Sequence, residues 1–360
     1  MLVGVPKEIK VHESRVALTP EGVFEFTRNG HEVVIEKGAG IGSAISDADF
    51  MSAGARIEQD VEKLWRDADL ILKVKEPIEV EYPRLRAGQI LFTYLHLAAS
   101  KPCTDALLKS GTTAIAYETV EVNGSLPLLA PMSEVAGRMS IQVGAAALEA
   151  SKGGAGVLLG GVPGVRPGKV VVIGGGVVGV AAATIAHGMR ADVTIMDLDL
   201  KRLAQIDQIF GGNVKTLASS GYEIEKEVMA ADLVVGAVLV HGAKAPKLVS
   251  NALVKKMKPG AVLVDVAIDQ GGCFEDSKAT THQDPTYKVH DAIFYCVANM
   301  PGAVPATSTA ALSNATLKYS LALANKGWQK AMEDDAGLAA GLNVHEGKIM
   351  YAAVAAAHAH

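Results

Sequence analysis

The stretch that decides the fold is Val170-Val171-Val172-Ile173-Gly174-Gly175-Gly176-Val177-Val178-Gly179. Its first four residues are apolar and β-branched, which is typical of a strand that is covered on both faces. Residues 180–189 follow with small and apolar side chains and no proline, as a helix requires. The stretch therefore predicts a strand, a glycine-rich turn and a helix in direct succession.

In this context the glycines match the pattern of a dinucleotide-binding turn. Gly174 permits the tight turn, Gly176 lets backbone N–H groups approach a pyrophosphate, and Gly179 allows the helix to pack closely on the strand. Val177 and Val178 stand between these glycines as further candidate cofactor-binding residues, and the positive end of the helix that follows favours phosphate groups. We expect a bound dinucleotide at this turn.

The carboxylate of Asp197 indicates which dinucleotide is bound. It ends the next predicted strand, residues 192–196, about twenty residues beyond the last glycine, where a carboxylate accepts hydrogen bonds from the ribose hydroxyls. It would repel a 2′-phosphate, so the sequence favours NAD over NADP. Arg202 lies close by; it either softens that preference or is a solvated helix residue.

Apolar β-branched runs continue to alternate with helical stretches on both sides of this unit, which predicts two α/β domains. The second half reads as a doubly wound parallel sheet with strands near residues 170–173, 192–196, 214–217, 233–238, 261–266 and 293–297. The first half repeats the alternation with strands near residues 2–5, 31–35, 70–74, 90–95 and 113–117.

Residues 308–325 and the alanine-rich segments beyond them read as helices. Because no strand is expected after residue 308, this tail should pack back on the first domain and make that domain discontinuous. The expected architecture is a Rossmann domain, residues 131–305, inserted into a flavodoxin-like α/β substrate domain formed by residues 1–130 plus 306–360.

Composition excludes several classes of protein. The 360 residues are 49% apolar, carry a formal net charge of −5, and contain no run of lysine and arginine, which argues against a nucleic-acid or anionic-membrane partner. Residues 170–189 lack formal charges, but their glycines argue against a membrane span. Three sparse cysteines, Cys103, Cys273 and Cys296, and the lack of a secretory signal favour free thiols in the cytoplasm.

Four ionisable side chains follow predicted strands, where ligands of open α/β sheets bind. Lys75 could meet a substrate carboxylate, or pair with Glu76 or Glu79 at the surface. Arg15 could hold a carboxylate with two parallel hydrogen bonds, or form a surface salt bridge with Glu13.

The other two candidates suit proton transfer. His96 leaves an apolar strand end, and its pKa range fits acid–base chemistry, although a hydrogen-bonded core histidine is the alternative. Asp269 precedes Gln270-Gly271-Gly272 and either orients a proton relay or caps the glycine turn. No closely spaced His/Cys cluster predicts a metal site, and no Gly-x-Ser-x-Gly motif supports a serine hydrolase.

These residues stand in motifs that resemble the bacterial L-alanine dehydrogenase family over nearly the whole chain. The motifs are Pro6-Lys7-Glu8, Arg15-Val16-Ala17-Leu18-Thr19-Pro20, Leu72-Lys73-Val74-Lys75-Glu76-Pro77, Tyr94-Leu95-His96-Leu97-Ala98, Pro131-Met132-Ser133-Glu134-Val135-Ala136-Gly137-Arg138, Asp265-Val266-Ala267-Ile268-Asp269-Gln270-Gly271-Gly272 and Asn299-Met300-Pro301-Gly302-Ala303-Val304-Pro305.

The resemblance implies reversible NAD-linked oxidative deamination of L-alanine to pyruvate and ammonium by a two-domain enzyme that assembles as a homohexamer. It implies that Arg15 and Lys75 hold the substrate and that His96 and Asp269 form the acid–base pair. It further implies an NAD site lined by Ser133, Asp197, Arg202, Ser219, Val238, Leu239, Val266, Ala267, Ile268, Asp269, Val297, Ala298, Asn299 and Met300.

Two positions depart from the family pattern. Ala306 stands where a basic residue is expected, and His241 stands where a proline commonly precedes Gly242; both are expected in loops near the cofactor. Two other functions compete with the dehydrogenase: the NAD-binding component of a nicotinamide nucleotide transhydrogenase, and a catalytically silent NAD-binding regulator. Neither requires the set of Arg15, Lys75, His96 and Asp269.

Overall fold

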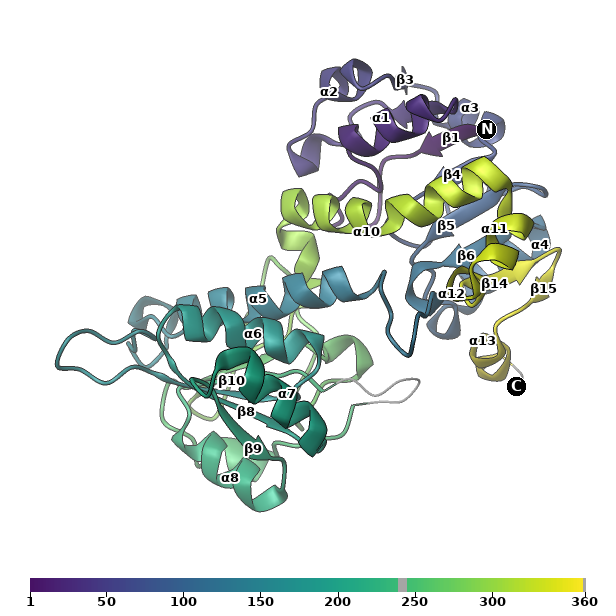
Figure 1. Cartoon of the computed structure of the whole chain (residues 1–360). Helices are drawn as coiled ribbons and strands as arrows, with labels where there is room; N and C mark the ends of the chain where they lie inside the picture. Colours follow the sequence, from purple (N-terminus) through teal and green to yellow (C-terminus); the bar gives the residue numbers. More distant parts are fainter. Residues whose placement is uncertain (239–244, 359–360) are drawn as a thin grey trace. The chain divides into compact units, whose positions relative to one another are not determined.

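A computed structural model describes residues 1–238 and 245–358 (Figure 1). It divides the chain into two α/β units. Unit 1 consists of residues 1–132 and 304–360, and unit 2 consists of residues 133–303. The chain therefore leaves unit 1, forms unit 2 and returns to unit 1.

The sheet of unit 2 has the strand order β9-β8-β7-β10-β11-β13-β12. All neighbours pair in parallel except β12, which runs antiparallel to β13 at the edge. The chain proceeds outward from β7 to β9 and then crosses to β10, so the order reverses between β7 and β10, which is where a doubly wound sheet binds its ligand. The strands are β7 (Lys169–Ile173), β8 (Asp192–Asp197), β9 (Lys215–Ala218), β10 (Leu233–Gly236), β11 (Val262–Asp265), β12 (Thr286–Val289) and β13 (Ala292–Tyr295).

Helices connect these strands and cover the sheet (Figure 1). They are α6 (Val177–Gly188), α7 (Leu200–Phe210), α8 (Gly221–Ala230) and the short α9 (Asn251–Val254). Helix α5 (Ala130–Ala147) begins at the end of unit 1 and continues into unit 2. It packs closely on α6, because a Cβ atom on Gly137 would lie 2.3 Å from the carbonyl oxygen of Val178.

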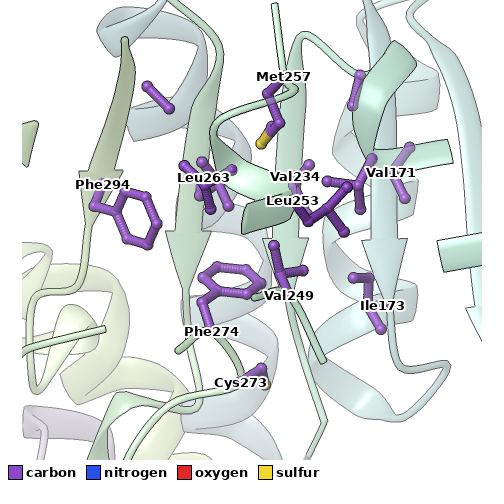
Figure 2. Packing of buried hydrophobic residues seen from close by; sticks show 14 of the residues in the cluster. Val171, Ile173, Val234, Val249, Leu253, Met257, Leu263, Cys273, Phe274 and Phe294 are labelled. Carbon is purple, nitrogen blue, oxygen red and sulfur yellow. The ribbon is translucent and has the colours of Figure 1, made fainter. Parts of the chain in front are cut away.

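The core of unit 2 lies on one face of this sheet. Figure 2 shows Val171, Val234 and Leu263 on neighbouring strands, with Val249 and Phe274 packed beside them. These side chains are fully buried. Burial of apolar area at about 25 cal/mol per Å² makes this layer a main source of stability, and it anchors the segments that follow the strands.

Unit 1 contains a second sheet, in the order β15-β14-β6-β5-β4-β1-β2-β3. The strands from β3 to β6 pair in parallel, and the succession β2-β1-β4-β5-β6 is the flavodoxin-like order. The strands are β1 (Leu2–Val5), β2 (Glu32–Glu36), β3 (Arg56–Glu58), β4 (Leu70–Leu72), β5 (Ile90–Thr93), β6 (Thr113–Ala116), β14 (Leu342–His345) and β15 (Lys348–Ile349).

The C-terminal segment completes unit 1 with the long helix α10, which lies beside α1 (Figure 1). Side-chain hydroxyl groups of α10 join it to the N-terminal segment: Thr309 Oγ1 accepts from Val16 N at 3.1 Å and Ser313 Oγ accepts from Thr19 N at 3.2 Å. The helices of the unit are α1 (Pro20–Arg28), α2 (Asp47–Ser52), α3 (Val61–Asp67), α4 (Lys101–Ser110), α10 (Pro305–Lys326), α11 (Trp328–Asp334), α12 (Ala336–Ala339) and α13 (Ala352–Ala357).

The structure confirms the predicted fold class, with a Rossmann sheet and a flavodoxin-like sheet in one chain. The expectation that no strand follows residue 308 is wrong, because β14 pairs antiparallel with β6 and with β15. Within the described residues, no helix combines the length and the apolarity that a membrane span needs. Residues 170–189 are divided between β7, the glycine turn and α6.

Candidate active site

The glycine turn of unit 2 has the geometry that close backbone approach requires. Gly174 adopts φ +108°, and a Cβ atom there would lie 2.7 Å from the carbonyl oxygen of Ala237. A Cβ atom on Gly179 would lie 1.8 Å from the carbonyl oxygen of Gly174. The first turn of α6 can therefore pack this closely on the glycine turn only because residue 179 has no side chain. Gly176 is the N-cap of α6, has no side-chain cap and faces open space. The helix N-terminus is therefore open to an anion.

Asp197 and Arg202 both bind the peptide groups of this turn. Asp197 Oδ2 accepts from Gly175 N at 2.6 Å, and its Oδ1 accepts from Asp199 N at 2.9 Å. Arg202 Nε donates to the Gly175 carbonyl oxygen at 2.6 Å. Asp197 is thus held at the end of β8 beside the turn, and Arg202 is attached to the turn itself, which differs from the solvated helix residue considered as the alternative.

The other candidate nucleotide residues of unit 2 follow neighbouring parallel strands, whose carboxyl ends share one edge of the sheet. Ser219 directly follows β9 and donates its N–H to the Asp197 carbonyl oxygen at 2.8 Å. Ser133 lies in α5, which packs on α6. The remaining ones are Val238 after β10, Val266, Ala267 and Ile268 after β11, and Val297, Ala298, Asn299 and Met300 after β13. Leu239 and His241 lie outside the described residues.

Arg15 and Lys75 bring two positive charges together at one edge of the sheet of unit 1. Arg15 is 2% exposed, and Glu13 accepts from its Nε at 2.7 Å and from its Nη2 at 2.6 Å. The pair with Glu13 that sequence analysis left open is therefore present, but it is buried. Burial, followed by the charge of Arg15, lowers the pKa of Lys75 below its usual range.

Lys75 is a half-buried ammonium without a fixed partner. Across residues 1–238 and 245–358, its Nζ forms no hydrogen bond or salt bridge, and the neighbouring Glu76 pairs with Lys10 instead. The surface ion pair of Lys75 with Glu76 or Glu79 is therefore not what the structure shows. The lowered pKa of Lys75 and its lack of a salt bridge are typical of a residue in a ligand-binding site.

His96 follows β5, which neighbours the strand before Lys75, so both leave the same edge of the sheet. It is exposed and adopts a left-handed conformation with φ +48°, which is uncommon for a residue with a side chain. Glu118 holds it there, accepting from His96 N at 2.6 Å and from Leu95 N at 3.1 Å. The Tyr94 ring stacks on the imidazole with 6.0 Å between centroids. The imidazole is therefore accessible from solvent, and His96 is not a buried core histidine.

A buried charge cluster lies under Lys75. Lys73 Nζ donates to Glu8 Oε2 at 3.1 Å and to Glu81 Oε1 at 2.9 Å. Glu8 Oε1 accepts from Val74 N at 2.6 Å and from Lys75 N at 3.3 Å. Burial alone would lower the pKa of Lys73, but the two carboxylates raise it above its usual value. The cluster fixes the backbone that carries the Lys75 ammonium.

Asp269 lies in unit 2, in the short 3-10 turn η6 (Ile268–Gln270) that follows β11. It is exposed, and the N–H groups of Gly271 and Gly272 donate to the carbonyl oxygens of Ile268 and Ala267, so within the described residues Asp269 does not cap these glycines. It shares the carboxyl edge of the unit 2 sheet with the glycine turn. A carboxylate there is available for a proton or a cationic ligand.

Sequence reasoning missed the residues that support the candidates: Glu8, Lys73, Glu81, Glu118, Lys247 and Asp265. Their partners are distant in sequence or lie on the backbone, so spacing does not reveal them. A usable signal exists for Lys73 and Asp265, since each is a charged residue within an apolar strand run. Ala306 was expected in a loop. That expectation is wrong, because Ala306 lies in the first turn of helix α10.

Two family models match most of the chain. Residues 4–136 match the model described as "Alanine dehydrogenase/PNT, N-terminal domain", and residues 140–352 match "Alanine dehydrogenase/PNT, C-terminal domain". A protein named alanine dehydrogenase from Mycolicibacterium smegmatis is 65% identical over 356 residues, which are 99% of this chain and 96% of that protein.

Solved structures agree with these matches. A structure titled L-alanine dehydrogenase superposes with a TM-score of 0.96 at 52% identity and covers 99% of both chains. A transhydrogenase from Sinorhizobium meliloti superposes with a TM-score of 0.83 at 24% identity, over 98% of this chain and 100% of that one. The second likeness concerns the fold alone.

Proposed function

The chain belongs to the alanine dehydrogenase/PNT family, and from this premise we infer that it is an NAD-dependent L-alanine dehydrogenase. The reaction converts L-alanine, NAD⁺ and water to pyruvate, ammonium, NADH and a proton, and it is reversible. The observation that carries this inference is 65% identity to an alanine dehydrogenase over 99% of the chain, combined with four ionisable groups at strand ends.

The residues of unit 2 fit NAD. The open N-terminus of α6 and the bare backbone of Gly176 suit the pyrophosphate, and the Asp197 carboxylate at the end of β8 suits the ribose hydroxyls. The bound nicotinamide supplies the hydride acceptor. We therefore assign unit 2 to the cofactor and unit 1 to the substrate.

On the substrate side, we propose that Lys75 binds the carboxylate and carbonyl region of alanine or pyruvate together with Arg15. The ammonium of Lys75 forms no salt bridge among the described residues. Glu13 fixes the plane of the Arg15 guanidinium, so this buried cation is oriented before substrate arrives. The two cations together offset the charge of a small amino-acid carboxylate.

Two groups share the proton transfers. The departing hydride leaves an iminium that water attacks, and the resulting carbinolamine collapses to pyruvate and ammonium, which requires proton acceptors. We propose His96 and Asp269 for these steps, because one displays an imidazole and the other a carboxylate at strand ends.

Purified protein is expected to form NADH from L-alanine and NAD⁺ at mildly alkaline pH and to consume it with pyruvate and ammonium. The absorbance of NADH measures both directions. Lack of turnover with alanine, glycine and serine alike would refute the dehydrogenase. Hydride exchange between two nucleotides without any amino acid would favour the transhydrogenase component, and NAD binding with no turnover of any kind would favour the silent regulator.

Pyruvate binding is expected to weaken as the pH rises through the lowered pKa of Lys75, because burial and Arg15 favour the neutral amine there. Below that pKa the ammonium is charged and the carboxylate is bound. NADH fluorescence of the enzyme–NADH complex, titrated with pyruvate from about pH 7 to about pH 10, gives the dissociation constant without ammonium. Lys75→Arg stays charged throughout this range, so its affinity should be independent of pH; a wild-type affinity without pH dependence contradicts the assignment.

We propose in addition that the enzyme acts in the cytoplasm as a homohexamer. Its three cysteines are free and buried, which fits a reducing compartment. The hexamer rests on the resemblance described above.

A further inference from the structure

The turn that carries Asp269 has little regular structure of its own. It leaves β11 at Asp265, forms the 3-10 turn η6, and continues through Gly271 and Gly272, both with positive φ. It rejoins the core at Cys273 and Phe274, which Figure 2 shows beside Val249 beyond the end of the strands. A segment with two adjacent glycines and an exposed carboxylate needs other contacts to stay in one conformation.

One set of contacts comes from the carboxylate of Asp265, which is fully buried. Its Oδ1 accepts from Ala267 N at 3.1 Å, and its Oδ2 accepts from Cys273 N at 2.8 Å and from Ser277 Oγ at 2.5 Å. Phe274 N also donates to Oδ2, at 3.3 Å. A buried charge is tolerated only when it is satisfied in this way. This carboxylate therefore binds both ends of the Asp269 turn, at Ala267 and at Cys273.

The second set comes from a cation. Lys247 Nζ donates to the carbonyl oxygens of Gly271 at 2.5 Å, Gly272 at 3.0 Å and Phe274 at 2.9 Å. Its three donors are thus all directed at the return half of the turn. The adjoining backbone runs beside the turn, since Leu248 N donates to the Cys273 carbonyl oxygen at 2.7 Å.

The two side chains bind the same return segment of the turn, and they share the peptide group between Gly272 and Cys273. The Asp265 carboxylate accepts hydrogen bonds from N–H groups of the turn, and the Lys247 ammonium donates hydrogen bonds to its carbonyl oxygens. We propose that Lys247 and Asp265 are positioning residues that hold the Asp269 turn in its reactive conformation. The proposal rests on the function proposed above. Proton transfer demands sub-ångström placement, so a misplacement of about 1 Å lowers turnover by about a hundredfold.

Lys247→Met tests this, because it removes the three donors and keeps the length of the side chain. We expect kcat for alanine oxidation to fall by about tenfold to a hundredfold. The dissociation constant of NADH, to which Val266, Ala267 and Ile268 of the same turn would contribute, should rise by a much smaller factor than kcat falls. Lys247→Arg, which keeps a cation with several donors, should restore most of kcat. Lys256→Met is the matched control in unit 2: Lys256 pairs with Glu225, and its loss should leave kcat unchanged.

Amide hydrogen exchange of the peptide that contains residues 266–277 supplies a second readout. Lys247→Met should speed its exchange by about tenfold or more and leave other peptides of the β-sheet unchanged. Turnover within about twofold of wild type, unchanged exchange, or an NADH affinity that falls as much as kcat does would each overturn the proposal.

The exchange measurement also separates this proposal from the function on which it rests. If wild-type protein does not oxidise alanine, the dehydrogenase function fails. Exchange in Lys247→Met then still decides whether Lys247 holds the turn, and unchanged exchange would refute that role.

Discussion

His96→Asn is expected to lower kcat for alanine oxidation by about a hundredfold to ten-thousandfold, the range for loss of a general acid or base. Asparagine accepts the left-handed conformation that position 96 requires, with φ +48°, more readily than alanine does. The substitution therefore removes the imidazole ring and spares the backbone. Because His96 lies in unit 1, the affinity for NADH should remain within about twofold of the wild-type value.

Steady-state kinetics with NADH absorbance and a fluorescence titration of NADH measure these two quantities. His31→Ala is the control: it removes an imidazole of the same unit that bonds to Asn325, and it should leave kcat unchanged. A His96→Asn enzyme with near wild-type turnover would show that proton transfer does not depend on this imidazole and would leave Asp269 as the acid–base group.

The fold could be predicted wherever a strand is an apolar run covered on both faces. The strands β7, β8, β10, β11 and β13 fulfil this condition, and the sequence placed each of them. Two of the strands it missed lie at sheet edges: Arg56–Glu58 forms β3 with no buried residue, and Thr286–Val289 forms β12 at the edge of unit 2. It also missed β14 and β15 near the C-terminus, and β14 lies between β15 and β6. Edge strands take their pairing from a neighbour rather than from their own hydrophobicity, so periodicity does not reveal them.

The candidate site was predictable to the extent that parallel strands place their carboxyl ends together. From the sequence alone, that rule indicates Lys75, His96 and Asp269. It says nothing about what holds these side chains. Glu118 lies 22 residues from His96, and Glu8 lies 67 residues from Lys75. The pairing of β5 with β6 brings the first two together, and the pairing of β1 with β4 brings the second two together.

Lys73→Met is expected to lower the free energy of unfolding of unit 1 by about 3–5 kcal/mol, because it leaves Glu8 and Glu81 buried without their shared cation. Both tryptophans of the chain, Trp65 and Trp328, lie in unit 1. Urea unfolding followed by tryptophan fluorescence therefore reports on this unit alone. Lys37→Met, at an exposed position of the same unit, is the control and should leave the unfolding midpoint unchanged.

The pH dependence identifies the cause of the loss. Burial already raises the pKa of Glu8 in the wild-type protein, although Lys73 opposes this shift. Without Lys73, the pKa of the folded state rises further above that of the unfolded state, so the variant takes up protons on folding and regains stability as the pH falls. Addition of Glu8→Gln should recover part of the loss at neutral pH, since one buried charge is gone and the amide oxygen can still accept from Val74 N. A destabilisation that is the same at acidic and neutral pH would instead attribute the loss to packing.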